Sequence, residues 1–159
     1  MTALKRLQSE YKQYLKEPNN YYCITPDTIN FYKWNILLFG ASETIFEGGI
    51  FNCEIIFPIE YPNKPPQFKF ITNLPHPNIY IDGKVCISIL HEGIDISEYE
   101  NINERWNPSH SVNSILMSIL SMIIAPNFQS PANVDMSKLW QNDFNTYKQL
   151  IYKIIANNH

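Results

Sequence analysis

The sequence lacks the features that mark several large classes of protein. It has no apolar run long enough to cross a membrane, and residues 1–18 are charged with a helical pattern, so neither a signal peptide nor a membrane span is expected. The formal net charge of −3 shows no basic excess, which argues against a nucleic-acid partner. There are no internal repeats or low-complexity linkers, so residues 1–159 are predicted to form one domain.

Cysteine is also scarce. The chain has three cysteines, Cys23, Cys53 and Cys86, and they do not have the spacing of metal ligands. An odd number of widely spaced cysteines favours reduced thiols over a disulfide framework. The sequence therefore predicts a cytoplasmic protein with no metal site.

The hydrophobic pattern changes along the chain. Apolar residues recur at helical spacing near the N-terminus, opposite a basic face. Short runs of β-branched and aromatic residues follow, separated by turn residues, which favours an antiparallel meander. The predicted class is α/β (α+β), with a helix at 2–16, strands at 21–25, 30–39, 49–58 and 67–71, and helices at 109–124, 131–138 and 141–156.

Two segments are predicted to be irregular. Residues 58–66 contain four prolines, which exclude a helix or a central strand and indicate a rigid exposed loop. Residues 74–107 have no sustained period, and such long irregular segments in compact domains are usually functional. This second segment contains Cys86, just after a turn at Asp82-Gly83. The thiol is either exposed and reactive or buried as a small apolar side chain, and cysteine chemistry alone leaves both open.

The motifs around Cys86 resemble a known active site. His76-Pro77-Asn78, followed by Cys86 eight residues after Asn78, is similar to the signature of ubiquitin-conjugating enzymes. Further segments resemble this family in the same order along the chain: Leu4–Leu7, Phe46–Gly49, Tyr61-Pro62, Pro65-Pro66, Trp106–Pro108 and Pro126-Asn127. The resemblance covers essentially the whole chain and implies the ubiquitin-conjugating fold: an N-terminal helix, a four-stranded antiparallel sheet, an active-site loop and C-terminal helices.

The resemblance implies a chemistry for this segment. Cys86 would accept ubiquitin as a thioester from an activating enzyme and would then be the leaving group when a lysine attacks. Asn78 would either donate a hydrogen bond to the oxyanion of that attack or brace the loop. His76, with Pro77, is interpreted as shaping the loop rather than as a general base. The chain itself would bind no cofactor, since ATP is consumed by the activating enzyme.

The attacking lysine must lose a proton, and the usual acids near the thiol are missing. The corresponding positions are Ser88 and Ser130. An insertion of about 15 residues, from His91 to Arg105, follows instead, and long connections of this kind are usually functional. It is rich in acids, namely Glu92, Asp95, Glu98, Glu100 and Glu104. It is either a solvated loop or a lid that activates the lysine, and His91, Glu92 and Asp95 are the candidate groups.

The insertion and the residues around it resemble the G subfamily. That subfamily builds degradative ubiquitin chains, and some members act in quality control at the endoplasmic reticulum. The resemblance therefore implies proteasomal degradation as the outcome and recruitment to that membrane surface as a possibility.

The resemblance to the family also implies which surfaces contact partners. Ubiquitin, the activating enzyme and a RING-type ligase are the implied partners, with Lys5 and Arg6 on the first helix and Pro62, Asn63, Asn107 and Pro108 on two loops as contact residues. A monomer is expected. Two positions depart from the family: Asn63 stands where many relatives have an apolar anchor, and Pro75 stands where an aromatic residue is usual.

Three other functions were weighed. An inactive ubiquitin-binding variant would lack the cysteine, and both Cys86 and Asn78 are present. A papain-like protease would need a triad and a longer chain. Conjugation of a ubiquitin-like modifier is the third alternative, and the insertion and the resemblance to the G subfamily favour ubiquitin over it.

Overall fold

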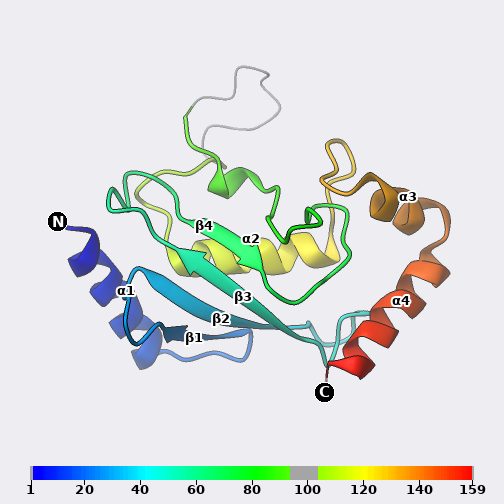
Figure 1. Ribbon diagram of the computed structural model, residues 1–159, viewed down its shortest axis with the longest axis horizontal. Helices are drawn as coiled ribbons and strands as arrows, with labels where there is room; N and C mark the ends of the chain where they lie inside the picture. The colour runs from blue at the N-terminus through cyan, green and yellow to red at the C-terminus, as the bar shows by residue number, and fades with distance from the viewer. Residues whose placement is uncertain (1, 94–103, 159) are drawn as a thin grey trace.

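The computed structural model describes residues 2–93 and 104–158 (Figure 1). It contains one N-terminal helix, four strands, a short 3₁₀ helix and three further α-helices. These are α1 Ala3–Lys16, β1 Tyr22–Pro26, β2 Lys33–Phe39, β3 Ile50–Ile56, β4 Gln67–Phe70, η1 Ser88–Leu90, α2 Val112–Ile124, α3 Val134–Asn142 and α4 Phe144–Asn157. The predicted order of elements and the α/β (α+β) class are confirmed. Asp95, Glu98 and Glu100 of the insertion lie outside the described residues.

The four strands form an antiparallel meander in the order β1-β2-β3-β4. Burial alternates along β2, so that Trp34, Ile36 and Leu38 point into the core while their neighbours face outward. Figure 1 shows α2 lying across the sheet. Ile115 and Ile119 of α2 are fully buried, and the core therefore lies between this helix and the inner face of the sheet.

Several predicted boundaries are wrong, and local side-chain bonds explain the differences. The second strand begins at Lys33 rather than residue 30, because the Asp27 carboxylate accepts the amides of Ile29 and Asn30 and holds them in a turn. The helix predicted from residue 109 begins at Val112, because Ser111 and Ser114 form a capping box. The last two helices are shifted toward the C-terminus, with Asp143 capping α4.

Candidate active site

Cys86 lies at the end of a short hairpin that leads out of the sheet. Isolated bridges pair Ile79 with Val85, and the amide of Cys86 donates to the carbonyl of Asn78 at 2.9 Å. The hairpin turns at Gly83, where φ is +95° and an added Cβ would lie 2.1 Å from the carbonyl oxygen of Phe70. This turn leaves Cys86 partly exposed, whereas Cys53 is buried in the sheet.

The side chain of Asn78 is 1% exposed and bonds to the backbone of Asn127. Its Nδ2 donates to the Asn127 carbonyl at 2.8 Å, and its Oδ1 accepts the Asn127 amide at 2.9 Å. This pair of bonds allows only one orientation of the amide, because the backbone amide needs an acceptor. The geometry favours the bracing role for Asn78 over the role of oxyanion donor.

His76 is fully buried, and both ring nitrogens have backbone partners. Nε2 donates to the carbonyl of Ile123 at 2.9 Å, and Nδ1 accepts the amide of Asn78 at 3.0 Å. Burial lowers the pKa of His76 from 6.5 to about 4, so the ring is neutral at physiological pH. These contacts match the interpretation of His76 as a loop-shaping residue.

Neighbouring backbone groups of the same turn also bond to the C-terminal part of the chain. The carbonyl of Pro77 accepts the amides of Ala132 and Asn133 at 2.8 and 3.0 Å. The carbonyl of Pro75 accepts the buried hydroxyl of Tyr147 at 2.8 Å. Pro75, which replaces the aromatic residue usual in the family, therefore lies in a turn that is hydrogen-bonded directly to α4.

A wide cleft of about 1280 Å³ opens beside Cys86. The structure brings Ser88, His91, Asn78 and Ser130, all singled out in the sequence, to its walls. The cleft also includes Glu104, one of the acids of the insertion, and three residues whose place in the site the sequence did not indicate, namely Ser118, Ser121 and Gln129. It exceeds the usual size of a small-molecule pocket and suits an extended peptide. Glu92 is exposed, and Asp95 lies outside the described residues.

The two ends of the insertion are joined at its base. The amide of Trp106 donates to the carbonyl of His91 at 2.9 Å. The Arg105 guanidinium donates to the carbonyls of Gly93 and Glu92 at 2.9 and 2.7 Å. The insertion is thus anchored beside the cleft by its two ends.

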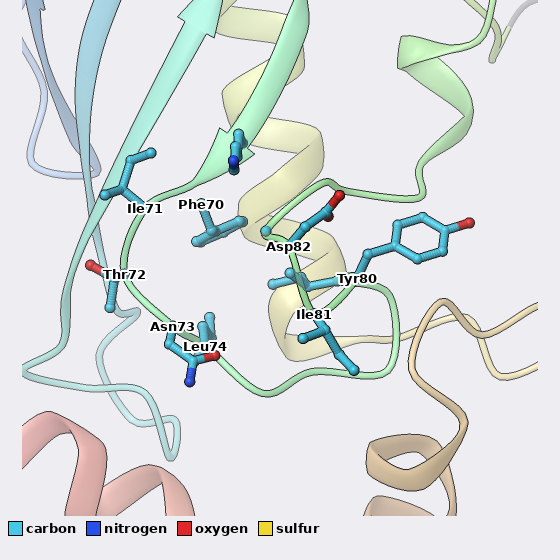
Figure 2. Close-up of a pocket in the computed structure, with 11 residues that line it drawn as sticks. Phe70, Ile71, Thr72, Asn73, Leu74, Tyr80, Ile81 and Asp82 are labelled. Carbon is cyan, nitrogen blue, oxygen red and sulfur yellow. The ribbon is translucent and has the colours of Figure 1, made fainter.

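Tyr80 is a site residue that sequence reasoning missed. Its phenol lies near enough to Cys86 that the charge of the ionised thiol raises the pKa of Tyr80. Figure 2 shows the ring turned away from Thr72 and Leu74, which lie across a separate hollow of about 270 Å³. The turn at Gly83 was the available signal, since a hairpin there pairs Tyr80 with residues just before Cys86.

The predicted partner residues lie at the opposite end of α2 from the His76 turn. Lys5 and Asn63 are exposed. The Trp106 Nε1 donates to the carbonyl of Pro62 at 2.8 Å, so the proline loop adjoins the segment that contains Asn107 and Pro108. Arg6 is half-buried, and its guanidinium donates to the Pro108 carbonyl at 3.1 Å.

Among residues 2–93 and 104–158, no group of three His, Cys, Asp or Glu side chains is arranged to hold a metal ion. Within the same residues, no helix is both long and apolar enough to cross a membrane.

Comparisons with known proteins agree with this geometry. The family model of the ubiquitin-conjugating enzymes matches residues 6–155. The chain is 46% identical to "Ubiquitin-conjugating enzyme E2 G2" of Bos taurus, over 98% of both chains. It is 45% identical to the Homo sapiens protein of that name, over 97% of this chain and 94% of the relative. It is 42% identical to "Ubiquitin-conjugating enzyme E2 7" of Arabidopsis thaliana, over 94% and 91%.

The buried state of His76 predicts a loss of stability in mild acid. Its pKa in the folded protein, about 4, lies below the ordinary 6.5 that it recovers on unfolding. The neutral ring therefore stabilises the fold fully above pH 6.5, and this contribution is lost as the pH falls from 6.5 toward 4. At pH 5 the loss should be about 2 kcal/mol. Urea unfolding at pH 7.5 and pH 5 measures it, and a His76→Gln variant with the same pH dependence as the wild type would contradict it.

The bonds of Asn78 predict that removing its amide affects stability. Asn78→Ala leaves the amide and carbonyl of Asn127 without their partners, which should cost about 1–3 kcal/mol of unfolding free energy. Asn35→Ala, on the exposed face of β2, is the control and should stay within about 0.5 kcal/mol of the wild type. An Asn78→Ala protein as stable as this control would show that the amide does not brace the loop.

Proposed function

Because the chain belongs to the ubiquitin-conjugating enzyme family and is of the G type, we propose that Cys86 is the thiol that carries ubiquitin. Enzymes of this family are transferases that hold ubiquitin as a thioester and pass it on. The observation that carries the proposal is the position of Cys86, partly exposed on the wall of the cleft of about 1280 Å³. Residues 1–159 would act as one catalytic domain.

The reaction has two steps. The thiolate of Cys86 attacks the thioester between ubiquitin and the activating enzyme, a new S–C bond forms, and the thiolate of the activating enzyme leaves. A lysine amine then attacks the carbonyl carbon, an isopeptide bond forms, and the Cys86 thiolate leaves. The cleft would hold the extended C-terminal tail of ubiquitin. ATP is spent by the activating enzyme, so this chain needs no cofactor of its own.

Side chains around the cleft would activate the attacking lysine. A free lysine has a pKa near ~10.4, so the attacking amine must be deprotonated by desolvation or by an acceptor. His91 shares the cleft with Cys86 and stands at the base of the insertion. We assign proton acceptance to His91, helped by the insertion acids Glu92 and Asp95, with Ser88 and Ser130 as polar neighbours in place of carboxylates.

Membership of the family implies ubiquitin, an activating enzyme and ligases as partners in general. We propose that the ligase is of the RING type and that it contacts Lys5 of α1 and Pro62, Asn63, Asn107 and Pro108. The last four lie on two loops that the Trp106–Pro62 bond joins. The proposal extends to a monomeric cytoplasmic enzyme, recruited to the endoplasmic reticulum surface, whose products go to the proteasome. The resemblance to the G subfamily supports these points.

A loading assay tests the carrier thiol. The protein is mixed with activating enzyme, ATP and ubiquitin, and the product is run on a non-reducing gel. A reductant-sensitive adduct should form with the wild type and with Cys23→Ala, and it should disappear in Cys86→Ala. An adduct that persists in Cys86→Ala would refute the assignment. An adduct formed only with a ubiquitin-like modifier would show that ubiquitin is not the cargo.

A discharge assay tests His91. Loaded enzyme is mixed with free lysine, and the loss of thioester is followed from pH 6 to pH 9. His91→Ala should slow discharge about 10- to 100-fold near pH 7, with a smaller deficit at high pH, where the amine loses its proton unaided. If His91→Ala discharges at the wild-type rate with an unchanged pH profile, His91 has no part in lysine activation.

A further inference from the structure

Glu10 of α1 joins three segments that are far apart in the sequence. Its Oε1 accepts the amide of Val112, the first residue of α2, at 2.8 Å. Its Oε2 accepts the hydroxyl of Tyr61 in the proline loop and the Nε of Arg6 one helical turn away. A carboxylate at the N-terminus of a helix is also favoured by the helix dipole. Glu10 therefore connects α1, the proline loop and the start of α2.

Arg6 and Trp106 complete a closed network of hydrogen bonds, the Glu10 circuit, which joins α1, the proline loop and the segment before α2. The Arg6 Nη2 donates to the carbonyls of Pro108 and His110 at 3.1 and 2.8 Å, so α1 also holds the segment before α2. The Trp106 indole donates to the carbonyl of Pro62, so that segment in turn holds the proline loop. In Figure 1 the three segments meet at the end of the molecule that carries the start of α1. Each segment is bonded to the other two.

The central members of this circuit are largely shielded from solvent. Tyr61 is 2% exposed, and its ring packs against Trp106 with centroids 5.7 Å apart and lies 5.8 Å below the Arg6 guanidinium carbon. The side chains of Arg6 and Glu10 are 22% and 13% exposed. A change at the Tyr61 hydroxyl therefore acts on a partner only by moving the loops around it.

We propose that Arg6, Glu10 and Tyr61 form a positioning unit that sets the relative placement of the two partner-binding loops, residues 58–66 and 104–111. The affinity for the activating enzyme and for a RING domain then depends on side chains that those partners do not touch. This rests on the proposed partner surface. Two loops held in a fixed relation bind with less ordering cost than two loops that move independently. Arg6 is thereby reassigned from a partner contact to a positioning residue, and Lys5 is left as the exposed cation beside it.

The test compares two buried phenols. Tyr61→Phe removes the bond to Glu10 and keeps the ring. Tyr22→Phe is the matched control, since Tyr22 is 3% exposed and its hydroxyl donates to the Asn113 side chain of α2, outside the circuit. Glu10→Gln is the second variant, because it keeps an acceptor oxygen and loses the charge. The probes are activating enzyme with ATP and ubiquitin, and an isolated RING domain selected because it stimulates the bovine relative.

Three kinetic quantities are measured: the KM for the conjugating enzyme in loading, the rate of discharge to free lysine without ligase, and the stimulation of that rate by the RING domain. The Tm of each variant is measured beside them. Tyr61→Phe and Glu10→Gln should raise the KM about 3- to 10-fold, and they should reduce the stimulation by the RING domain to a similar degree. Unassisted discharge should stay at the wild-type rate. Tyr22→Phe should show a similar fall in Tm with wild-type KM and stimulation.

The outcomes separate the inference from the function on which it rests. If the wild type is neither loaded nor stimulated, the proposed partner surface itself fails. If the wild type behaves as expected and Tyr61→Phe matches Tyr22→Phe in all three quantities, the circuit contributes only to stability and the inference is overturned. A parallel fall in unassisted discharge would also overturn it, because the effect would then reach the catalytic loop as a whole.

Discussion

The position of Cys86 depends on the hydrogen bonds between the His76–Asn78 turn and the backbone at the end of α2. His76 binds the carbonyl of Ile123, and Asn78 binds both backbone groups of Asn127. A helix leaves its last carbonyls without internal partners, so a buried ring N–H is well suited to that end. The amide of Cys86 donates a hydrogen bond to the carbonyl of Asn78, and this bond fixes the position of the thiol relative to α2. Without these bonds a long irregular segment would have no fixed place for its cysteine.

The architecture was predictable because its signals are local. Alternation in β2 and helical spacing in α2 come from residues that face one core, and they gave the right order of the strands and α-helices. The predicted boundaries were wrong where the hydrogen bonds of a polar side chain set the start of an element. Asp27 does this before β2, and Ser111 does it before α2. Such caps are single contacts, and the hydrophobic pattern does not record them.

The site was predictable in part for a related reason. Cys86, Asn78 and His76 form a motif with fixed spacing, whereas Tyr80 reaches the thiol only through the hairpin at Gly83. The long-range contacts of Arg6 were not foreseen, because a cation on the outer face of a helix looks available in sequence. Its carbonyl partners lie more than 100 positions away, and no local pattern could indicate them. The residues that sequence reasoning misses are those whose role comes from long-range contacts with backbone atoms.

Both ends of α2 are satisfied by side chains from elsewhere in the chain, and this makes the helix a rigid spacer. At its start the Glu10 carboxylate accepts the amide of Val112, and at its end His76 donates to the carbonyl of Ile123. The thirteen residues between span about 20 Å at the rise of an α-helix. The partner surface is therefore built on one end of the helix and the thiol on the other. Each end is held by a polar group that is buried or largely shielded from solvent. Neither the loops near Tyr61 nor the turn at Asn78 can therefore shift along the helix without leaving one of these groups unpaired, a cost of about 1–3 kcal/mol. The distance between the proposed partner surface and the Cys86 thiol is thus set by the two bonds that close the ends of α2.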